Sequence, residues 1–228
     1  MSLPKLNVSV HEAKLPSTNK VIKFRPFLVK EEKILLTAME DGEQSSMMNA
    51  VKNIIKNCVQ SKIDVDKLPI FDIEYIFLKL RAKSVGEKSN INLKCQECET
   101  QNEVEIDMEK VEVFKPKDHN RKIMINDEVG VMMSYPVITT AGVDEQDGMK
   151  IVQDCIEMIF NGEETHERGS YTEKELNDFI ESMDSKQFGK IKNFFDTMPK
   201  LQHSIEFNCV SCGKENFIML EGLDSFFE

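Results

Sequence analysis

The sequence predicts an α+β protein in which amphipathic helices are combined with antiparallel β-hairpins. Three observations lead to this fold class. Apolar residues recur at helical spacing in several segments, and short runs that alternate apolar with polar residues occur in pairs. Two of these pairs enclose the motifs Cys95-Gln96-Glu97-Cys98 and Cys209-Val210-Ser211-Cys212. We therefore expect two hairpins that each present two thiols at the tip.

One structural zinc site is the prediction from these motifs. Zn²⁺ binds four thiolates at about 2.3 Å, and a two-residue spacer lets one turn offer both of its sulfurs to one ion. Both motifs follow strands and lead into turns, whereas a redox motif of the same spacing opens a helix. We expect one Zn²⁺ per chain in a closed, zinc-ribbon-like site. Its ligands would be Cys95, Cys98, Cys209 and Cys212.

The distance between the motifs in the sequence is unusual for a zinc module. They are separated by 110 residues, where a compact module has roughly 15–20. Tertiary structure must therefore close the site. Disulfides and two unrelated free-thiol hairpins are the alternatives.

The net charge and the distribution of apolar residues argue against a nucleic-acid-binding protein and against a membrane protein. The 228 residues carry a net charge of −11, which opposes nucleic-acid binding because a protein that grips phosphates needs a Lys/Arg surface. No run approaches the ~20 apolar residues of a membrane helix, and no apolar segment follows Met1. We expect a protein of the reducing cytoplasm without a membrane contact, and that compartment favours zinc over disulfides.

The chain begins with two expected strands and a helix. Residues 6–10 and 20–27 alternate as strands do, with a turn cluster from Pro16 between them. Residues 30–41 have a helical pattern that ends before Gly42.

The segment Phe24-Arg25-Pro26-Phe27 has two interpretations. Arg25 and Phe27 form a docking segment for a partner protein, or the aromatic side chains of an edge strand face the core while Arg25 lies in solvent. The second interpretation is the simpler one.

Two helices with apolar stripes follow. The first stripe has the spacing i, i+3, i+4, i+7 and i+8. In the second helix, Asp72 is the expected cap and Gly86 the expected end. The first stripe consists of Val51, Ile54, Ile55, Cys58 and Val59.

Further strands and helices complete the chain. Strands are expected at 111–115, 122–126 and 129–135. Thr172 and Glu175 form a capping box before one helix, and Ser185 opens another, which Pro199 ends.

The two halves of the chain show an internal similarity. The segment Ile54-Ile55-Lys56-Asn57-Cys58-Val59-Gln60 matches Ile151-Val152-Gln153-Asp154-Cys155-Ile156-Glu157 in apolar or polar character at every position. Both segments are expected to be helical. We interpret this as a duplication of a helix pair followed by a cysteine hairpin, with convergence of two short patterns as the alternative.

This interpretation divides the chain into four segments that form one globular unit. They are 1–45 (strands and first helix), 46–115 (first helix pair and cysteine hairpin), 116–140 (a β-hairpin connector) and 141–228 (second helical repeat and cysteine hairpin).

No catalytic constellation is recognisable. The four histidines lie in dissimilar contexts, and no Gly-rich phosphate loop is present. Carboxylates are numerous in 157–181, but they lie on or between amphipathic segments and indicate solvated faces. We expect a non-enzyme without a small-molecule substrate.

The C-terminus carries two adjacent aromatic residues, Phe226 and Phe227. Chain ends are mobile unless they are docked. These side chains either pack back onto the fold, which we favour, or anchor a partner protein.

Together, several features resemble the baseplate hub proteins of T4-like contractile-tailed bacteriophages. They are the segment from Phe24 to Lys33, the paired Cys-x-x-Cys hairpins, the matched helices and the Gly222…Phe226-Phe227 ending. The resemblance implies a non-enzymatic role in building the hub, as an assembly factor or a hub component. It implies other hub or tail proteins as partners, in the host cytoplasm during assembly and in the virion baseplate.

A second function remains open. An acidic zinc-ribbon protein can also regulate nucleic-acid-processing proteins, because its negative surface suits a basic partner.

Overall fold

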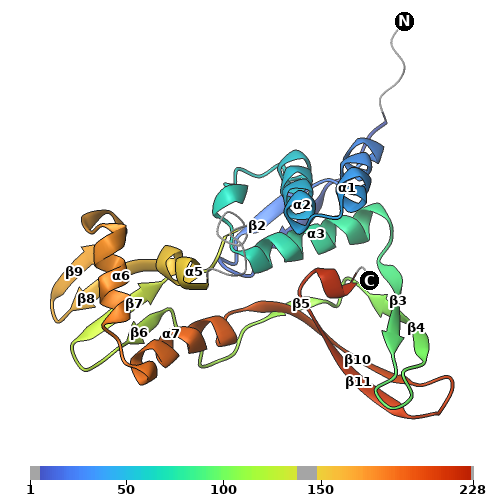
Figure 1. Ribbon diagram of the computed structural model, residues 1–228. Helices are drawn as coiled ribbons and strands as arrows, with labels where there is room; N and C mark the ends of the chain where they lie inside the picture. Colours follow the sequence, from blue (N-terminus) through green and yellow to red (C-terminus); the bar gives the residue numbers. More distant parts are fainter. Residues whose placement is uncertain (1–5, 138–147, 227–228) are drawn as a thin grey trace, which may run out of the picture. The chain divides into compact units, whose positions relative to one another are not determined.

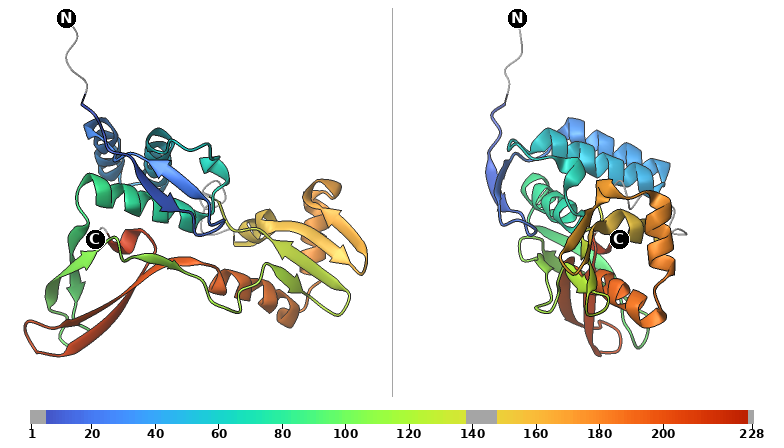
Figure 2. Two further views of the ribbon diagram at one scale, coloured as in Figure 1. Left: turned by 180° about the vertical axis from the view of Figure 1, so that it is seen from behind. Right: turned by 90° about the vertical axis from the view of Figure 1, so that its left-hand side faces the viewer.

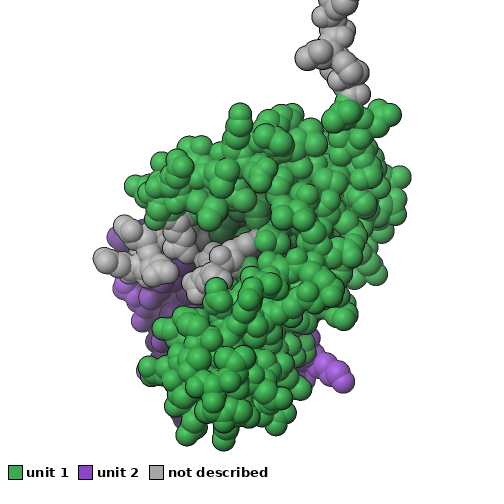
Figure 3. Space-filling model, turned by 90° about the vertical axis from the view of Figure 1, so that its right-hand side faces the viewer, with its two compact units in different colours: residues 1–114, 200–228 green, residues 115–199 purple. Residues whose placement is uncertain are grey.

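The computed structural model (Figure 1) describes residues 6–137 and 148–226. They form helices and small antiparallel sheets joined by loops. This confirms the mixture of helices and antiparallel strands expected from the sequence. The contacts divide the chain into two compact units (Figure 3). Residues 1–114 and 200–228 form unit 1, and residues 115–199 form unit 2. Among the described residues, no helix combines the length and the apolar character needed to cross a membrane.

Unit 1 begins with a hairpin and a group of helices. Strand β1 (His11–Lys14) pairs with β2 (Val21–Phe24), so the expected strand at 6–10 is wrong. It lies too early because the Leu15–Lys20 turn brings His11, not the preceding residues, opposite Phe24. The helices are α1 (Val29–Asp41), α2 (Gln44–Cys58) and α3 (Ile70–Ser84), with the short η1 (Val65–Lys67) before α3.

The apolar stripe on α2 faces the core as expected. Val51, Ile54, Ile55 and Cys58 are all buried. Helix α1 packs against α2, and α2 packs against α3. Figure 1 shows α3 between this helix pair and the C-terminal strands.

Asp72 does not cap α3. The helix begins one turn earlier, after Pro69, and the buried Asp72 carboxylate instead accepts hydrogen bonds from the backbone N–H and the hydroxyl of Ser17. Burial raises the pKa of Asp72, while the Ser17 bonds oppose that change. The Asp72 carboxylate therefore links the turn after β1 to helix α3 by hydrogen bonds.

The rest of unit 1 is built from the two cysteine hairpins. Strands β3 (Lys88–Lys94) and β4 (Gln101–Asp107) form a two-stranded sheet. Strands β10 (Lys200–Asn208) and β11 (Glu215–Glu221) pair with each other, and β10 also pairs with β5 (Glu112–Phe114). The short η3 (Asp224–Phe226) follows β11. The pairing of β5 with β10 brings the last part of the chain into unit 1.

Unit 2 has its own sheet and core. Four strands are hydrogen-bonded in the order β6-β7-β8-β9. Among its described residues, three helices and the short η2 (Arg168–Ser170) complete the unit. The strands are β6 (Lys122–Met124), β7 (Val129–Met133), β8 (Ile156–Asn161) and β9 (Glu164–Glu167), and the helices are α5 (Gly148–Cys155), α6 (Glu173–Glu181) and α7 (Ser185–Thr197). Its buried residues include Val131, Met133, Ile156, Leu176, Ile191 and Phe194.

The starts of α6 and α7 agree with the sequence pattern. Thr172 and Glu175 form the predicted capping box, and Asp184 caps α7 by accepting from the N–H groups of Lys186 and Gln187. The expected helix through Glu157 is wrong in its last residues, because α5 ends at Cys155 and β8 begins at Ile156, paired with Met133.

The duplication and the four expected segments stay predictions. Both cysteine hairpins lie in unit 1, and the second set of helices lies in unit 2. In addition, α5, the helix expected to correspond to α2, is followed directly by strand β8, whereas α2 is followed by η1 and α3.

Gly130 marks the tightest contact in the sheet of unit 2. A Cβ atom built on Gly130 overlaps the ring of Phe160 and lies 2.8 Å from the carbonyl oxygen of Ile123. We expect Gly130→Ala to lower the free energy of unfolding by about 1–3 kcal/mol, as overpacked positions do. Urea unfolding checks this. Gly169→Ala is the control, because a Cβ at Gly169 meets no atom within 4 Å, and a large loss in both variants would contradict the steric explanation.

Candidate metal centre

The two hairpin tips bring the four predicted cysteine ligands together. In Figures 1 and 2 the β3–β4 and β10–β11 turns lie side by side. The sulfur of Cys95 is 3.7 Å from that of Cys212, and the sulfur of Cys98 is 3.6 Å from that of Cys209. All four sulfurs lie within 4.8 Å of one another.

These distances fit a metal better than they fit disulfides. A tetrahedron with four Zn–S bonds of about 2.3 Å has S···S edges of about 3.8 Å, and both cross-hairpin distances come close to that value. A disulfide needs about 2.05 Å, and all four thiols are free. Among residues 6–137 and 148–226, these cysteines are the one group of three or more His, Cys, Asp or Glu residues with ligand atoms close enough to hold a metal.

The two turns have the same backbone structure, 114 residues apart. The N–H of Cys95 donates to Thr100 O, and the N–H of Cys209 donates to Lys214 O. In each turn the residue four places after the first cysteine donates back to that cysteine's carbonyl and has a positive φ: 58° at Glu99 and 71° at Gly213. Glycine suits such a position and glutamate is strained there. The turns therefore present their thiols in equivalent ways.

Backbone N–H groups prepare the first cysteine of each pair as a thiolate. The N–H groups of Cys98 and Glu97 point at the Cys95 sulfur and lower its pKa to about 6. Those of Cys212 and Ser211 lower the pKa of Cys209 in the same way. Hydrogen bonds to the charged form stabilise it.

The fourth thiol shows why a cation suits this site. The N–H of Lys214 lowers the pKa of Cys212, but the neighbouring sulfurs of Cys98, Cys209 and Cys95 raise it to about 12. Four thiolates this close repel one another, so they require a positive charge between them. A divalent metal would supply that charge.

Two buried asparagines brace the hairpins against each other. The side-chain oxygen of Asn102 accepts from the N–H of Val210 at 2.8 Å, and that of Asn216 accepts from the N–H of Gln96 at 2.9 Å. Each side-chain NH₂ also donates within its own turn, to Thr100 O or Lys214 O. Each hairpin thus holds the cysteine turn of the other.

Asn102 and Asn216 are not among the residues predicted from the sequence. A signal for them exists, since each lies seven residues after the first cysteine of its motif. An asparagine in an otherwise alternating strand, repeated at the same offset in both hairpins, indicates a shared structural task.

Removing one brace is expected to weaken metal binding without removing a ligand. Asn102→Ala leaves the N–H of Val210 without its acceptor, which costs about 1–3 kcal/mol of stability, while the Thr100 carbonyl keeps the bond from the N–H of Cys95. Outer-shell partners are worth about 10–100-fold in metal affinity, and competition with a zinc-binding dye measures that change. Asn90→Ala is the control because Asn90 is an exposed β3 residue whose side-chain amide donates to Glu103 and not to the other hairpin. Equal zinc affinity in both variants would contradict the bracing role.

The residues predicted to bind partners lie largely inside unit 1. Phe27 and Phe226 are buried, and Arg25 bonds to the Glu31 carboxylate and to the carbonyls of Pro26 and Asn57. Phe227 lies outside the described residues. Partner binding by these four residues stays a prediction, and it requires the buried ones to become exposed.

Comparison with known proteins gives one family and one relative. The family model of the T4 bacteriophage base plate protein matches residues 8–228. The baseplate hub assembly protein gp26 of Enterobacteria phage T4 is 28% identical over 211 residues, which is 92% of this chain and 94% of that protein. No solved structure gives a significant match. With a match that runs from the first hairpin through both cysteine turns to the C-terminus, the chain belongs to the T4 bacteriophage base plate protein family.

Proposed function

We propose that this protein is a non-enzymatic assembly factor or component of a bacteriophage baseplate hub, and that it acts through contacts with other hub or tail proteins. The observation that carries this proposal is the similarity, along nearly the whole length of both chains, to a baseplate hub assembly protein. Because function resides in particular sites and not in the fold class, similarity that includes nearly every segment of both chains supports a related role better than one shared motif would.

A structural zinc is the second part of the proposal. All four positions around the ion would be taken by protein thiolates, and such closed sites stabilise folds, whereas catalytic zinc sites keep a position open for water or substrate. The matched turns and the reciprocal asparagine bonds support a site built for one ion. The 114-residue repeat of the whole hairpin supports duplication of this element.

The place of action follows from the proposed role. We expect the protein in the host cytoplasm during tail assembly, with the virion baseplate as the second location to test. Other hub or tail proteins are the proposed partners, and nucleic acids, membranes and small-molecule substrates are not.

The decisive experiment is removal of the protein from an infecting phage, with a tagged copy supplied for purification. We expect tails that fail at the hub, and co-purification of the tagged protein with hub proteins. Normal tails, together with capture of a polymerase or nuclease, would contradict the proposal and favour the acidic regulator. Immunoblots of purified virions determine whether the protein remains in the particle.

A further inference from the structure

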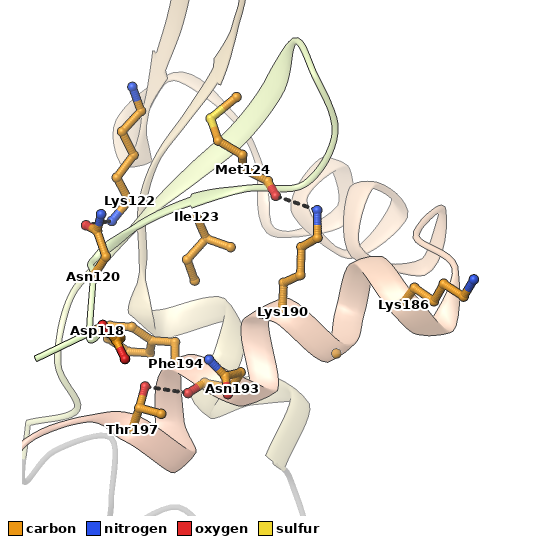
Figure 4. A pocket seen from close by; sticks show the side chains of 11 residues that line it. Asp118, Asn120, Lys122, Ile123, Met124, Lys186, Lys190, Asn193, Phe194 and Thr197 are labelled. Atoms are coloured by element: carbon orange, nitrogen blue, oxygen red, sulfur yellow. Dashed lines mark hydrogen bonds between the residues drawn. The ribbon is translucent and has the colours of Figure 1, made fainter. Parts of the chain in front are cut away.

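Unit 2 contains a surface pocket that is separate from the metal centre of unit 1 and borders the core of unit 2. It lies between α7 and the segment that leads into β6, and it is an open depression with a volume of about 450 Å³. In Figure 4, Ile123 points from β6 toward Phe194 and Asn193 of α7. The volume is within the ~300–1,000 Å³ typical of pockets that hold a ligand group.

The floor of the pocket is apolar and closely packed. Phe194 is buried and packs against the rings of His119 and Tyr135, with centroids 5.0 and 5.7 Å away. His119 is fixed in turn by hydrogen bonds to Thr197 and Tyr135. On the other side, Met124 is 40% exposed. An apolar side chain from outside would therefore find a preformed surface.

The surroundings of the pocket are basic although the chain is acidic. Residues 115–122 and 184–197 contain seven Lys or Arg and three Asp, against a net charge of −11 for the whole chain. Lys122 and Lys186 are exposed at opposite margins of the pocket (Figure 4), and the ammonium of Lys122 lies 4.6 Å from the centroid of the Phe160 ring, an aromatic contact and not an ion pair. The ammonium of Lys190 donates to the carbonyls of Met124 and Ile125, so its charge is also not neutralised by a carboxylate.

Gly189 keeps this site open. It lies inside α7, where glycine costs about 1 kcal/mol relative to alanine, and its φ is not in the left-handed region. A Cβ at Gly189 would meet no atom within 4 Å, so close packing does not require the glycine. Gly189 lines the pocket, and a long side chain at this position would occupy it.

We infer that this pocket docks an acidic segment of a partner protein, with one apolar side chain on the Ile123–Phe194 floor and flanking carboxylates on Lys122 and Lys186. The inference deepens the proposed assembly function, on which it rests, by stating the chemistry of the partner. Complementary charge at the rim orients such a segment and excludes basic ones.

Nucleic acid is the less suitable occupant. Residues 157–184 of the same unit carry nine Asp or Glu and two Lys or Arg. A polyphosphate backbone would meet this charge beyond the pocket, whereas a short peptide needs only the local lysines.

Peptide binding to the full-length protein tests the inference directly. The probe is a fluorescent synthetic peptide with a central Phe flanked by Asp and Glu, and the same peptide with flanking Lys is the comparison. We expect saturable binding of the acidic peptide, weaker at high salt because exposed charges are screened. No saturable binding, or equal binding of the basic peptide, would overturn the inference.

Matched variants locate the binding site. We expect Lys122→Glu/Lys186→Glu to lower the affinity by at least about tenfold, and Lys33→Glu/Lys174→Glu, with the same charge change on exposed residues outside the pocket and its basic surroundings, to leave it unchanged. Gly189→Leu should block the pocket while it raises helix propensity, and Gly189→Ala, which adds only a methyl group, should retain more binding. Equal affinities across the pocket and control variants would overturn the inference.

A capture experiment separates this inference from the assembly function. If wild-type protein captures hub proteins and the pocket variants capture them equally well, the pocket is not the docking site although the assembly function stands. If wild-type protein captures no hub protein, the assembly function fails, and the peptide measurements still decide whether the pocket binds acidic segments.

Discussion

Replacing Cys95 or Cys209 by serine is expected to release the zinc and to destabilise unit 1. Each variant removes one of four ligands from a site that joins two hairpins, and each leaves three close thiols without a complete cation site. Structural zinc contributes apparent binding energies of ~10–16 kcal/mol in small zinc modules. Helices and sheet pairing also support unit 1, so we expect a smaller loss here, of at least about 3 kcal/mol. For a chain of this length that corresponds to a melting temperature lower by roughly 10 °C.

The measurements are zinc per chain by elemental analysis and thermal unfolding on the same samples. Wild-type protein should hold about one zinc, and a strong chelator should bring its melting temperature close to that of the variants. Ser211→Ala is the matched control in the turn, because its exposed hydroxyl is not a ligand. Cys155→Ala removes a buried thiol in unit 2, so it should lower stability while the zinc content stays the same. Unchanged metal content in Cys95→Ser would reject the site.

The two thiols at the tip of each cysteine hairpin could be predicted because their signal is local. A Cys-x-x-Cys motif between two alternating runs determines a hairpin with two thiols at its tip, whatever the rest of the chain does. The bracing asparagines are different. Their partners, Val210 and Gln96, lie in the other hairpin, and only the relative placement of the two turns reveals the bonds.

The errors in the fold have a similar origin. Ile151 to Glu157 has a helical pattern, but Ile156 is drawn into the sheet by pairing with Met133, so tertiary contacts override local preference. The grouping of elements into units also depends on distant pairing, because Val113 of β5 lies opposite Leu201 of β10. The capping box of α6, by contrast, acts within one turn of helix. The start of α6 was therefore predictable from Thr172 and Glu175 alone.

Arg25→Ala is expected to be the second most damaging of these changes, because it leaves a carboxylate buried without its main partner. The Arg25 guanidinium lies 2.9 Å from Glu31, whose side chain is 1% exposed. Losing one member of a buried pair costs about 3–5 kcal/mol. We expect about 3 kcal/mol, since Lys30 and the N–H of Leu28 still contact the carboxylate. Arg25→Lys keeps the positive charge but not the planar guanidinium group that forms two bonds at once, so its stability should lie between that of wild type and that of Arg25→Ala.

The pH dependence gives this prediction a distinctive sign. Burial alone would raise the pKa of Glu31, but the bonds from Arg25 and Leu28 bring it below its usual value. In the wild type, Glu31 therefore contributes stability that is present above the unfolded pKa near 4.5 and lost as the pH falls. Without Arg25 the burial effect dominates, the folded pKa rises above the unfolded value, and protonation relieves the damage.

The difference in unfolding free energy between wild type and Arg25→Ala should consequently shrink as the pH falls from 7 toward 4, measured by urea unfolding. The double variant Arg25→Ala/Glu31→Gln controls for lost packing. It has no buried charge to protonate, so its difference from wild type should shrink less, by only the stability that wild-type Glu31 loses as the pH falls. A difference that stays constant with pH in both variants would mean that Arg25 stabilises the segment by packing alone. Wild-type stability combined with lost capture of hub proteins would instead assign Arg25 to the partner contact that the sequence suggested.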